Sequence, residues 1–220
     1  MPMAKSKNTS PMIFSDKSLS QAEDFLSTKD PVMRALISNM EIEFPYNREV
    51  SFKYLARIII NQQLSSKAAA TIYDRFCNLF GDHKVSHSEA LKLDPEHFHK
   101  CGISKQKTIF IQNIAAEFEK DPYLIEFFNS SSNEAAYERL VQIKGIGQWS
   151  ASAFLLFNLR RIDIFCVGDG TLNRAIDGLY EINSKDDPIA FDSLIESWKP
   201  YRSVACLYLW KWIDTGKPAV

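Results

Sequence analysis

Two apolar runs at helical spacing, separated by a Gly-Ile-Gly turn, constrain this chain more than any other feature of its sequence. Gly145 and Gly147 permit a positive φ and let the main chain approach another molecule closely. The helix that follows would begin beside this turn, where free N–H groups and the positive end of the helix dipole favour a phosphate. We therefore predict two helices joined by a short hairpin and packed through apolar positions on both sides of it: Leu140, Ile143, Ile146, Ala151 and Phe154.

A Gly-Ile-Gly sequence alone also occurs in ordinary turns between helices, and support for a special role comes from Asp169. This acid follows the second helix after a linker of residues 160–168 and opens a further apolar run that includes Leu172 and Ile176. An Asp in such a place is most often an N-cap, which contributes about 1 kcal/mol. The hairpin and the acid occur together much more rarely than either part, so Asp169 is a candidate for chemistry as well as for capping.

The remaining sequence predicts an all-α fold. Apolar residues recur at helical spacing in these segments: 52–60, 68–80, 108–118, 136–143, 149–159, 189–198 and 204–213. Serine N-caps, glycine C-caps and prolines at helix starts are expected at these positions: Ser66, Ser104, Gly81, Gly102, Pro122, Pro188 and Pro200. The β-branched run Ile58-Ile59-Ile60 could pass for a strand, but it has no pairing partner and no hairpin turn.

A chain of 220 residues suits one cored domain, which we expect over 16–220 as two helical lobes flanking a cleft. Residues of about 60–160 would form most of one lobe, and the N- and C-terminal helices would form the other. Residues 1–15 are expected to be a disordered tail, because the start of the chain is polar and lacks the apolar core of a signal peptide. The longest apolar stretch, 151–159, is far shorter than the ~20 residues of a membrane span, so we expect a soluble, intracellular protein with no membrane partner.

The cysteines and histidines do not form a recognisable metal site. The cysteines are widely and irregularly spaced, which is typical of reduced core residues: Cys77, Cys101, Cys166 and Cys206. His83 and His87 stand four apart, and His97 and His99 alternate with Cys101, as zinc ligands can. This stretch is polar and loop-rich and has no matching Cys-x-x-Cys or His-Glu-x-x-His pattern, so we expect no metal bound by side chains.

Three segments, 144–159, 163–175 and 196–210, resemble the hairpin, catalytic-loop and C-terminal segments of the helix-hairpin-helix DNA glycosylases. Within that superfamily, Asn61-Gln62-Gln63-Leu64-Ser65-Ser66-Lys67-Ala68-Ala69 and Trp198-Lys199-Pro200-Tyr201-Arg202-Ser203 resemble the alkylation-repair (3-methyladenine) branch, which includes the Mag-type proteins of yeasts. The resemblance covers about residues 20–215. It implies a monomeric, nuclear base excision repair protein that acts on double-stranded DNA containing alkylated bases or abasic sites.

The resemblance also implies a role for each matching residue. Asp169 would stabilise the positive charge that develops on the deoxyribose, or activate the attacking water. Trp149 and Tyr201 would line the pocket for a flipped base, where aromatic rings attract a cationic alkylpurine. Gln63 and Leu64 would fill and hold open the gap left in the duplex. Further DNA contacts would come from neighbouring positions: Ser65, Lys67, Lys144, Gly145, Ile146, Gly147 and Arg202.

The net charge is −1, from 26 basic and 27 acidic residues, so a DNA partner requires a local basic patch. Basic side chains do gather next to the matching segments: Lys53, Arg57, Lys67, Lys105, Lys107, Lys144, Lys199 and Arg202. Each one alone is more simply a solvated surface charge, and the prediction of a DNA-binding patch depends on their grouping.

Trp149 stands two residues after the second hairpin glycine, where bifunctional members of the superfamily carry a lysine that forms a Schiff base. The resemblance therefore implies a monofunctional enzyme that needs no cofactor, and the cysteine spacing predicts no iron–sulfur cluster. Three features depart from the family pattern: Ser65 and Ala153 are small, and the loop Cys166-Val167-Gly168 lacks a stiffening proline. A protein that binds lesions or abasic sites with little or no base excision is therefore the second hypothesis.

Overall fold

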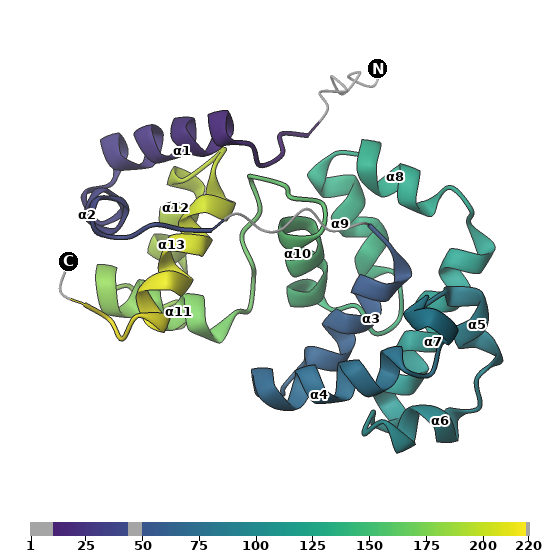
Figure 1. Ribbon diagram of the computed structural model, residues 1–220. Helices are drawn as coiled ribbons and strands as arrows, with labels where there is room; N and C mark the ends of the chain where they lie inside the picture. The colour runs from purple at the N-terminus through teal and green to yellow at the C-terminus, as the bar shows by residue number, and fades with distance from the viewer. Residues whose placement is uncertain (1–10, 44–49, 219–220) are drawn as a thin grey trace, which may run out of the picture. The chain divides into compact units, whose positions relative to one another are not determined.

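The computed structural model describes residues 11–43 and 50–218, and its regular elements there are α-helices and one short 3-10 turn (Figure 1). The predicted all-α class is confirmed. No strand occurs in these two ranges, and Ile58-Ile59-Ile60 lies inside a helix. By its internal contacts the chain divides into two compact units. The first contains residues 50–154 and the second contains residues 12–43 and 155–218.

The first unit is formed by the helices of residues 50–154. Its elements are α3 (Phe52–Asn61), α4 (Ser66–Cys77), η1 (Gly81–His83), α5 (His87–Lys92), α6 (Pro95–Lys100), α7 (Lys105–Lys120), α8 (Leu124–Ser130), α9 (Asn133–Val141) and the first part of α10 (Gln148–Phe157). The long helix α7 packs against α3, α5 and α6, and α3 also packs against α4 (Figure 1). The buried face of α7, with Ile111, Ile114 and Phe118, forms the centre of the core of the first unit.

The second unit brings together helices from both ends of the chain. Its elements are α1 (Asp16–Lys29), α2 (Pro31–Asn39), α11 (Gly170–Tyr180), α12 (Pro188–Ser197) and α13 (Arg202–Asp214), together with the end of α10. Helix α13, yellow in Figure 1, packs against α1, α2 and α11 and buries Val204, Leu209 and Trp212.

A buried carboxylate, Asp30, joins three helices of the second unit. Its Oδ1 accepts hydrogen bonds from the N–H groups of Val32 and Met33 and so caps α2. Its Oδ2 accepts from the Tyr180 hydroxyl and the Trp198 indole, both at 2.9 Å. Because Asp30 is only 7% exposed, these four donors compensate for the loss of its hydration.

The helix boundaries agree with several sequence signals and differ from others. Pro122 and Pro200 were predicted at helix starts, but each lies two residues before its helix, α8 or α13. Ser104 caps α7, and Pro188 is the first residue of α12. The N-cap of α4 is Ser65 and not Ser66, which is already helical. Gly81 was predicted to end a helix, but α4 ends four residues earlier and Gly81 opens the 3-10 turn η1. Gly102, with φ +94°, follows α6 as predicted for a residue past a helix end.

The largest difference from the predicted secondary structure lies around His97 and His99. This stretch was predicted to be loop-rich, but it contains the short helices α5 and α6. Six residues are too few to show helical periodicity in sequence, and serine and aspartate caps define these helices instead.

The predicted N-terminal tail also differs where it can be compared. Residues 1–10 lie outside the described residues. Phe14, however, is buried, Ser15 caps α1, and Ile13 forms an isolated antiparallel bridge with Arg161. None of the helices in the two described ranges combines the length and the apolar character that a membrane crossing requires.

Candidate functional site

The predicted hairpin is present between α9 and α10, where residues 142–147 form the connecting loop. Gly145 has φ +111°, and a Cβ there would lie 2.3 Å from Cγ of Phe110, so only glycine fits. Gly147 is different: it is exposed, and a Cβ there would meet no heavy atom within 4 Å. Gly145 is therefore required by the fold, whereas Gly147 leaves the surface at the start of α10 open.

Side chains around the hairpin separate into a buried anchor and an exposed surface. Ile146 is 4% exposed, and its N–H donates to the Ile143 carbonyl. Lys144 is exposed, and its carbonyl accepts a hydrogen bond from Asn113 Nδ2 at 3.2 Å. Trp149, in the first turn of α10, is half-buried. The buried Ile146 thus anchors the hairpin, while Lys144 and the backbone at Gly147 are exposed to solvent.

Residues 62–65 form a second loop, between α3 and α4, which we call the α3–α4 loop. Gln63 is exposed and adopts φ +55°, and Leu64 is 39% exposed, which is unusual for a leucine beside a buried helix end. Ser65 Oγ accepts a hydrogen bond from Ala68 N and caps α4. Gln63 and Leu64 are therefore available to a partner, while the Ser65 hydroxyl already has a structural role.

Two further observations concern the surroundings of the α3–α4 loop. The side chain of Gln62 donates through Nε2 to Oγ of Ser150 at 2.9 Å, which ties the loop to the first turn of α10. Lys67 is exposed in the first turn of α4 and borders a shallow hollow of about 410 Å³. The structure therefore joins the predicted loop and hairpin residues within one unit.

In the second unit, Asp169 is the N-cap of α11, as predicted. Its Oδ1 accepts hydrogen bonds from the N–H groups of Thr171 and Leu172 at 2.8 and 2.9 Å. The indole Nε1 of Trp210 lies 3.3 Å from the same oxygen, and the Trp210 ring stacks on Phe157 with centroids 5.5 Å apart. Three donors therefore fix the orientation of this half-buried carboxylate. No sequence signal indicates this role of Trp210, because a tryptophan on an apolar helix predicts only a core position.

The loop before Asp169 is held by a buried serine on α13. Oγ of Ser203 donates to the Arg161 carbonyl at 2.7 Å and accepts from the Ile164 N–H at 2.9 Å. Burial raises the pKa of Cys206 to about 12, and burial also raises the pKa of Cys166 well above its usual range, so both side chains are neutral thiols. Hydrogen bonds from another helix thus hold residues 161 and 164, which precede the segment 166–168 that lacks a proline.

Arg202 and Tyr201 have partners inside the second unit. Arg202 donates to both oxygens of Asp163, from Nε at 2.7 Å and from Nη2 at 3.1 Å, and both side chains are only 18% exposed. The Tyr201 ring contacts Phe25 edge-on, with centroids 5.2 Å apart. These contacts give Arg202 a structural role that competes with the predicted DNA contact.

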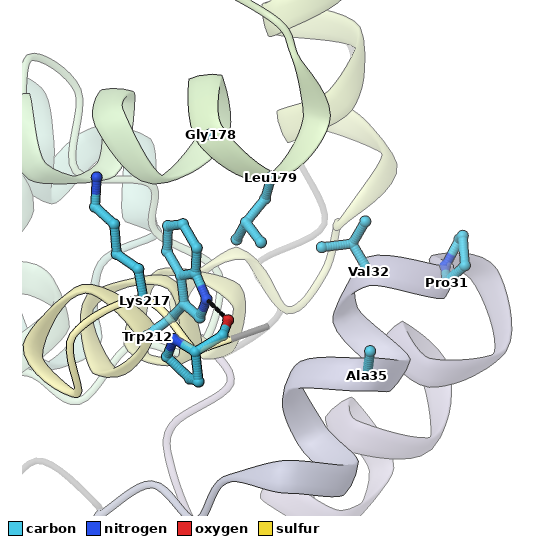
Figure 2. A pocket seen from close by; sticks show the side chains of 8 residues that line it. Pro31, Val32, Ala35, Gly178, Leu179, Trp212 and Lys217 are labelled. Carbon is cyan, nitrogen blue, oxygen red and sulfur yellow. Dashed lines mark hydrogen bonds between the residues drawn. The ribbon is translucent and has the colours of Figure 1, made fainter. Parts of the chain in front are cut away.

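The second unit has two hollows whose linings differ in charge. One of about 460 Å³ is lined by Val32, Leu179 and Trp212, and Figure 2 shows these side chains around it, with Trp212 Nε1 donating to the Pro218 carbonyl. It has no carboxylate. A second, of about 560 Å³, borders Val167 and Gly168 beside the Asp169 loop. Among the described residues, no group of three or more His, Cys, Asp or Glu side chains could hold a metal ion.

Comparisons with known proteins agree with this geometry. Residues 56–200 match the model of the HhH-GPD superfamily base excision DNA repair proteins. The chain is 28% identical to the alkylbase DNA glycosidase-like protein mag2 of Schizosaccharomyces pombe, over 89% of this chain and 94% of that protein. It is 30% identical to DNA-3-methyladenine glycosylase 1 of the same yeast, over 88% and 87% respectively.

A solved structure extends this likeness to three dimensions. The S. pombe 3-methyladenine DNA glycosylase Mag1, in complex with abasic DNA, superposes with a TM-score of 0.78 and 27% identity, covering 91% of this chain and 100% of that one. The predicted resemblance to the alkylation-repair branch is therefore confirmed.

Proposed function

Because the chain belongs to the HhH-GPD superfamily of base excision DNA repair proteins, we propose that it binds DNA containing alkylated purines, flips the damaged nucleotide and hydrolyses its N-glycosidic bond. The observation that carries this proposal is Asp169, a carboxylate oriented by three donors at the start of α11 in a chain of this family. The product would be an abasic site, and the partner would be double-stranded DNA.

The first unit would bind the duplex. The exposed Gly147 and the start of α10 allow a phosphate to approach backbone N–H groups, and Lys144 and Lys67 add positive charge nearby. Gln63 and Leu64 would enter the space that a flipped base leaves, because they are exposed on a loop whose base is fixed. DNA affinity would thus come from a local surface, as a net charge of −1 requires.

The second unit would supply the carboxylate. Cleavage of the bond between C1′ and the base nitrogen sends the electron pair to the base and leaves positive charge on the sugar, and the oxygen of a water molecule then bonds to C1′. Asp169 would stabilise that charge or accept the proton of the water. A cationic alkylpurine is already a good leaving group, so the step needs no dedicated general acid. Trp149 would stack an aromatic ring on the flipped base, whereas the Tyr201 ring is held edge-on against Phe25.

The proposed enzyme is monofunctional. The position two residues after Gly147 is Trp149, so this position offers no amine for a Schiff base with the sugar. No cofactor enters the proposed reaction, because the carboxylate and water suffice for hydrolysis. We further propose that the protein acts as a monomer in the nucleus, where its substrate lies.

A second candidate is lesion binding with little or no excision. It is favoured by the capping role of Asp169, which a protein without catalysis would also keep, and by the small Ser65, whose hydroxyl caps α4. The exposed Leu64 would serve either function.

One experiment distinguishes these candidates. Single-turnover release of 3-methyladenine and 7-methylguanine is measured from alkylated DNA, beside binding to a duplex with one abasic site and to the same duplex intact. Base release above the uncatalysed rate supports the glycosylase. Preferential binding of the abasic duplex without base release supports the second candidate, and the absence of both excludes the two together.

A further inference from the structure

Lys107 directs its ammonium group into the protein and not toward solvent. It lies on α7, where sequence grouping assigned it to the DNA-binding patch. Its Nζ instead donates to two backbone carbonyls, that of Ile60 at 2.9 Å and that of Gln62 at 2.7 Å. Burial lowers the pKa of Lys107, as expected for an ammonium group withdrawn from water.

Both acceptors lie at the C-terminal end of α3, where helix carbonyls lack intrahelical partners. Two of the neighbouring carbonyls are satisfied locally, since Gln62 N donates to Ile59 and Leu64 N donates to Asn61. The Ile60 and Gln62 carbonyls are bonded by Lys107. A cation is favoured at this end of a helix by the helix dipole as well as by the hydrogen bonds.

The next residue shows why the loop needs such an anchor. Gln63 has φ +55°, a left-handed conformation that is unfavourable for a residue with a side chain. Such a conformation persists only where the surroundings impose it. Gln62, immediately before it, is held at both ends, because its carbonyl accepts from Lys107 and its side-chain amide donates to Ser150.

We propose that Lys107 is a positioning residue for lesion recognition: it holds the α3–α4 loop in the one conformation that presents Gln63 and Leu64 to a gap in DNA. The proposal rests on the proposed function, because it assigns that role to the loop. Lys107 thereby acts through the loop and not through a phosphate. Its loss would reduce the preference for damaged over intact duplex without abolishing DNA binding.

The test uses Lys107→Met, which keeps an unbranched apolar side chain of similar reach and removes the ammonium donors. Lys120→Met is the matched control, because Lys120 is exposed on the same helix and carries the same charge. Two quantities are measured: amide hydrogen exchange of residues 61–65, and the ratio of affinities for abasic and intact duplex. For Lys107→Met we expect faster amide hydrogen exchange of residues 61–65 and about a tenfold lower ratio of abasic to intact affinity. The reason is that the loop loses a charged hydrogen-bond donor that holds it in place. Lys120→Met should change neither quantity.

Further variants separate positioning from general stability. Lys107→Arg retains a cation with several donors and should recover most of the affinity ratio. Ser150→Ala removes only the bond to Gln62 and should loosen the loop partially. If Lys107→Met does not fold, Lys107→Gln, which keeps an amide donor, is measured in its place.

The outcomes are distinguishable from failure of the proposed function. Unchanged hydrogen exchange in Lys107→Met overturns the anchoring role whatever the DNA measurements show. Faster exchange with an unchanged affinity ratio overturns the role in lesion recognition. If the wild-type protein neither releases a base nor prefers abasic DNA, the proposed function fails by itself, and hydrogen exchange alone decides whether Lys107 anchors the loop.

Discussion

The indole Nε1 of Trp210 donates a hydrogen bond to Oδ1 of Asp169 at 3.3 Å. This bond links α13 to the N-cap of α11. Trp210 is itself held by stacking on Phe157 at an interplanar angle of 24°. The carboxylate is therefore oriented by its own helix and by an aromatic pair from two other segments. Such an arrangement limits the rotation of the group that would face the developing charge.

Trp210→Phe tests this positioning role. The substitution keeps a ring against Phe157 but removes the indole donor, so we expect base excision to slow about fivefold, equivalent to about 1 kcal/mol. Affinity for abasic duplex should stay within about twofold, because the donor contacts Asp169 and not DNA. Trp212→Phe is the control, since its indole donates to the Pro218 carbonyl from the same helix. Equal effects of the two variants on excision would show that ring size matters and the hydrogen bond does not.

Asp169→Asn separates chemistry from capping. Asparagine is as good an N-cap as aspartate, so α11 should stay folded and stability should change by no more than about 0.5 kcal/mol. Base release should be abolished while DNA binding is retained, because the charge acts in the transition state. Asp187→Asn, which alters the N-cap of α12, should leave both unchanged. Full excision by Asp169→Asn would remove this residue from the mechanism.

The long helices were predictable from sequence because two independent signals coincide there. The apolar period of 108–118 is bounded by the Ser104 cap, and that of 189–198 begins beside Pro188. Helices α5 and α6 have only six residues each, so periodicity could not reveal them. Hydrogen bonds from backbone N–H groups to the oxygen of a capping side chain define such helices, and these depend on backbone geometry that composition does not encode.

The candidate site was predictable only where local geometry determines a residue's role. Asp169 caps a helix and Gly145 makes a left-handed turn, and both features are local. The roles of Lys107 and Arg202 depend on partners 45 and 39 positions away, namely Gln62 and Asp163. No pattern of nearby residues distinguishes a basic side chain that binds phosphate from one that binds a distant carbonyl or carboxylate.

The two hairpin glycines should respond differently to alanine. Gly147→Ala meets open space, so the protein should fold normally, but the added methyl group should weaken binding to intact and damaged duplex by about tenfold if a phosphate approaches there. Gly145→Ala forces a Cβ against Phe110 at a positive φ and should lower the free energy of unfolding by roughly 1–3 kcal/mol. Thermal unfolding and duplex binding measure both. Normal DNA affinity in a folded Gly147→Ala protein contradicts a backbone contact at this position.

Tyr180 should make the protein sensitive to alkaline pH. Burial, and then the neighbouring Asp30 carboxylate, raise the pKa of Tyr180 far above its usual range. Above a pH of about 10 the unfolded phenol ionises while the folded one keeps its proton, so stability falls as pH rises, by up to about 1.4 kcal/mol per pH unit. Tyr180→Phe should remove the contribution of one proton to the slope of the free energy of unfolding against pH. Trp198→Phe also removes a donor to Asp30 but no titrating group, and it should leave the slope unchanged in urea unfolding between about pH 7 and about pH 11.

The exposed pair Gln63 and Leu64 should separate lesion recognition from DNA affinity. A side chain that fills a gap is useful only where a base has left the stack, so the double variant Gln63→Ala with Leu64→Ala should lose most of its preference for abasic duplex. Binding to intact duplex should persist, because the hairpin and Lys144 are untouched. Truncating the partly exposed Leu64 should cost little stability, since its side chain is 39% exposed. An unchanged ratio of abasic to intact affinity would assign this loop to packing, and lesion recognition would then have to come from the aromatic side chains.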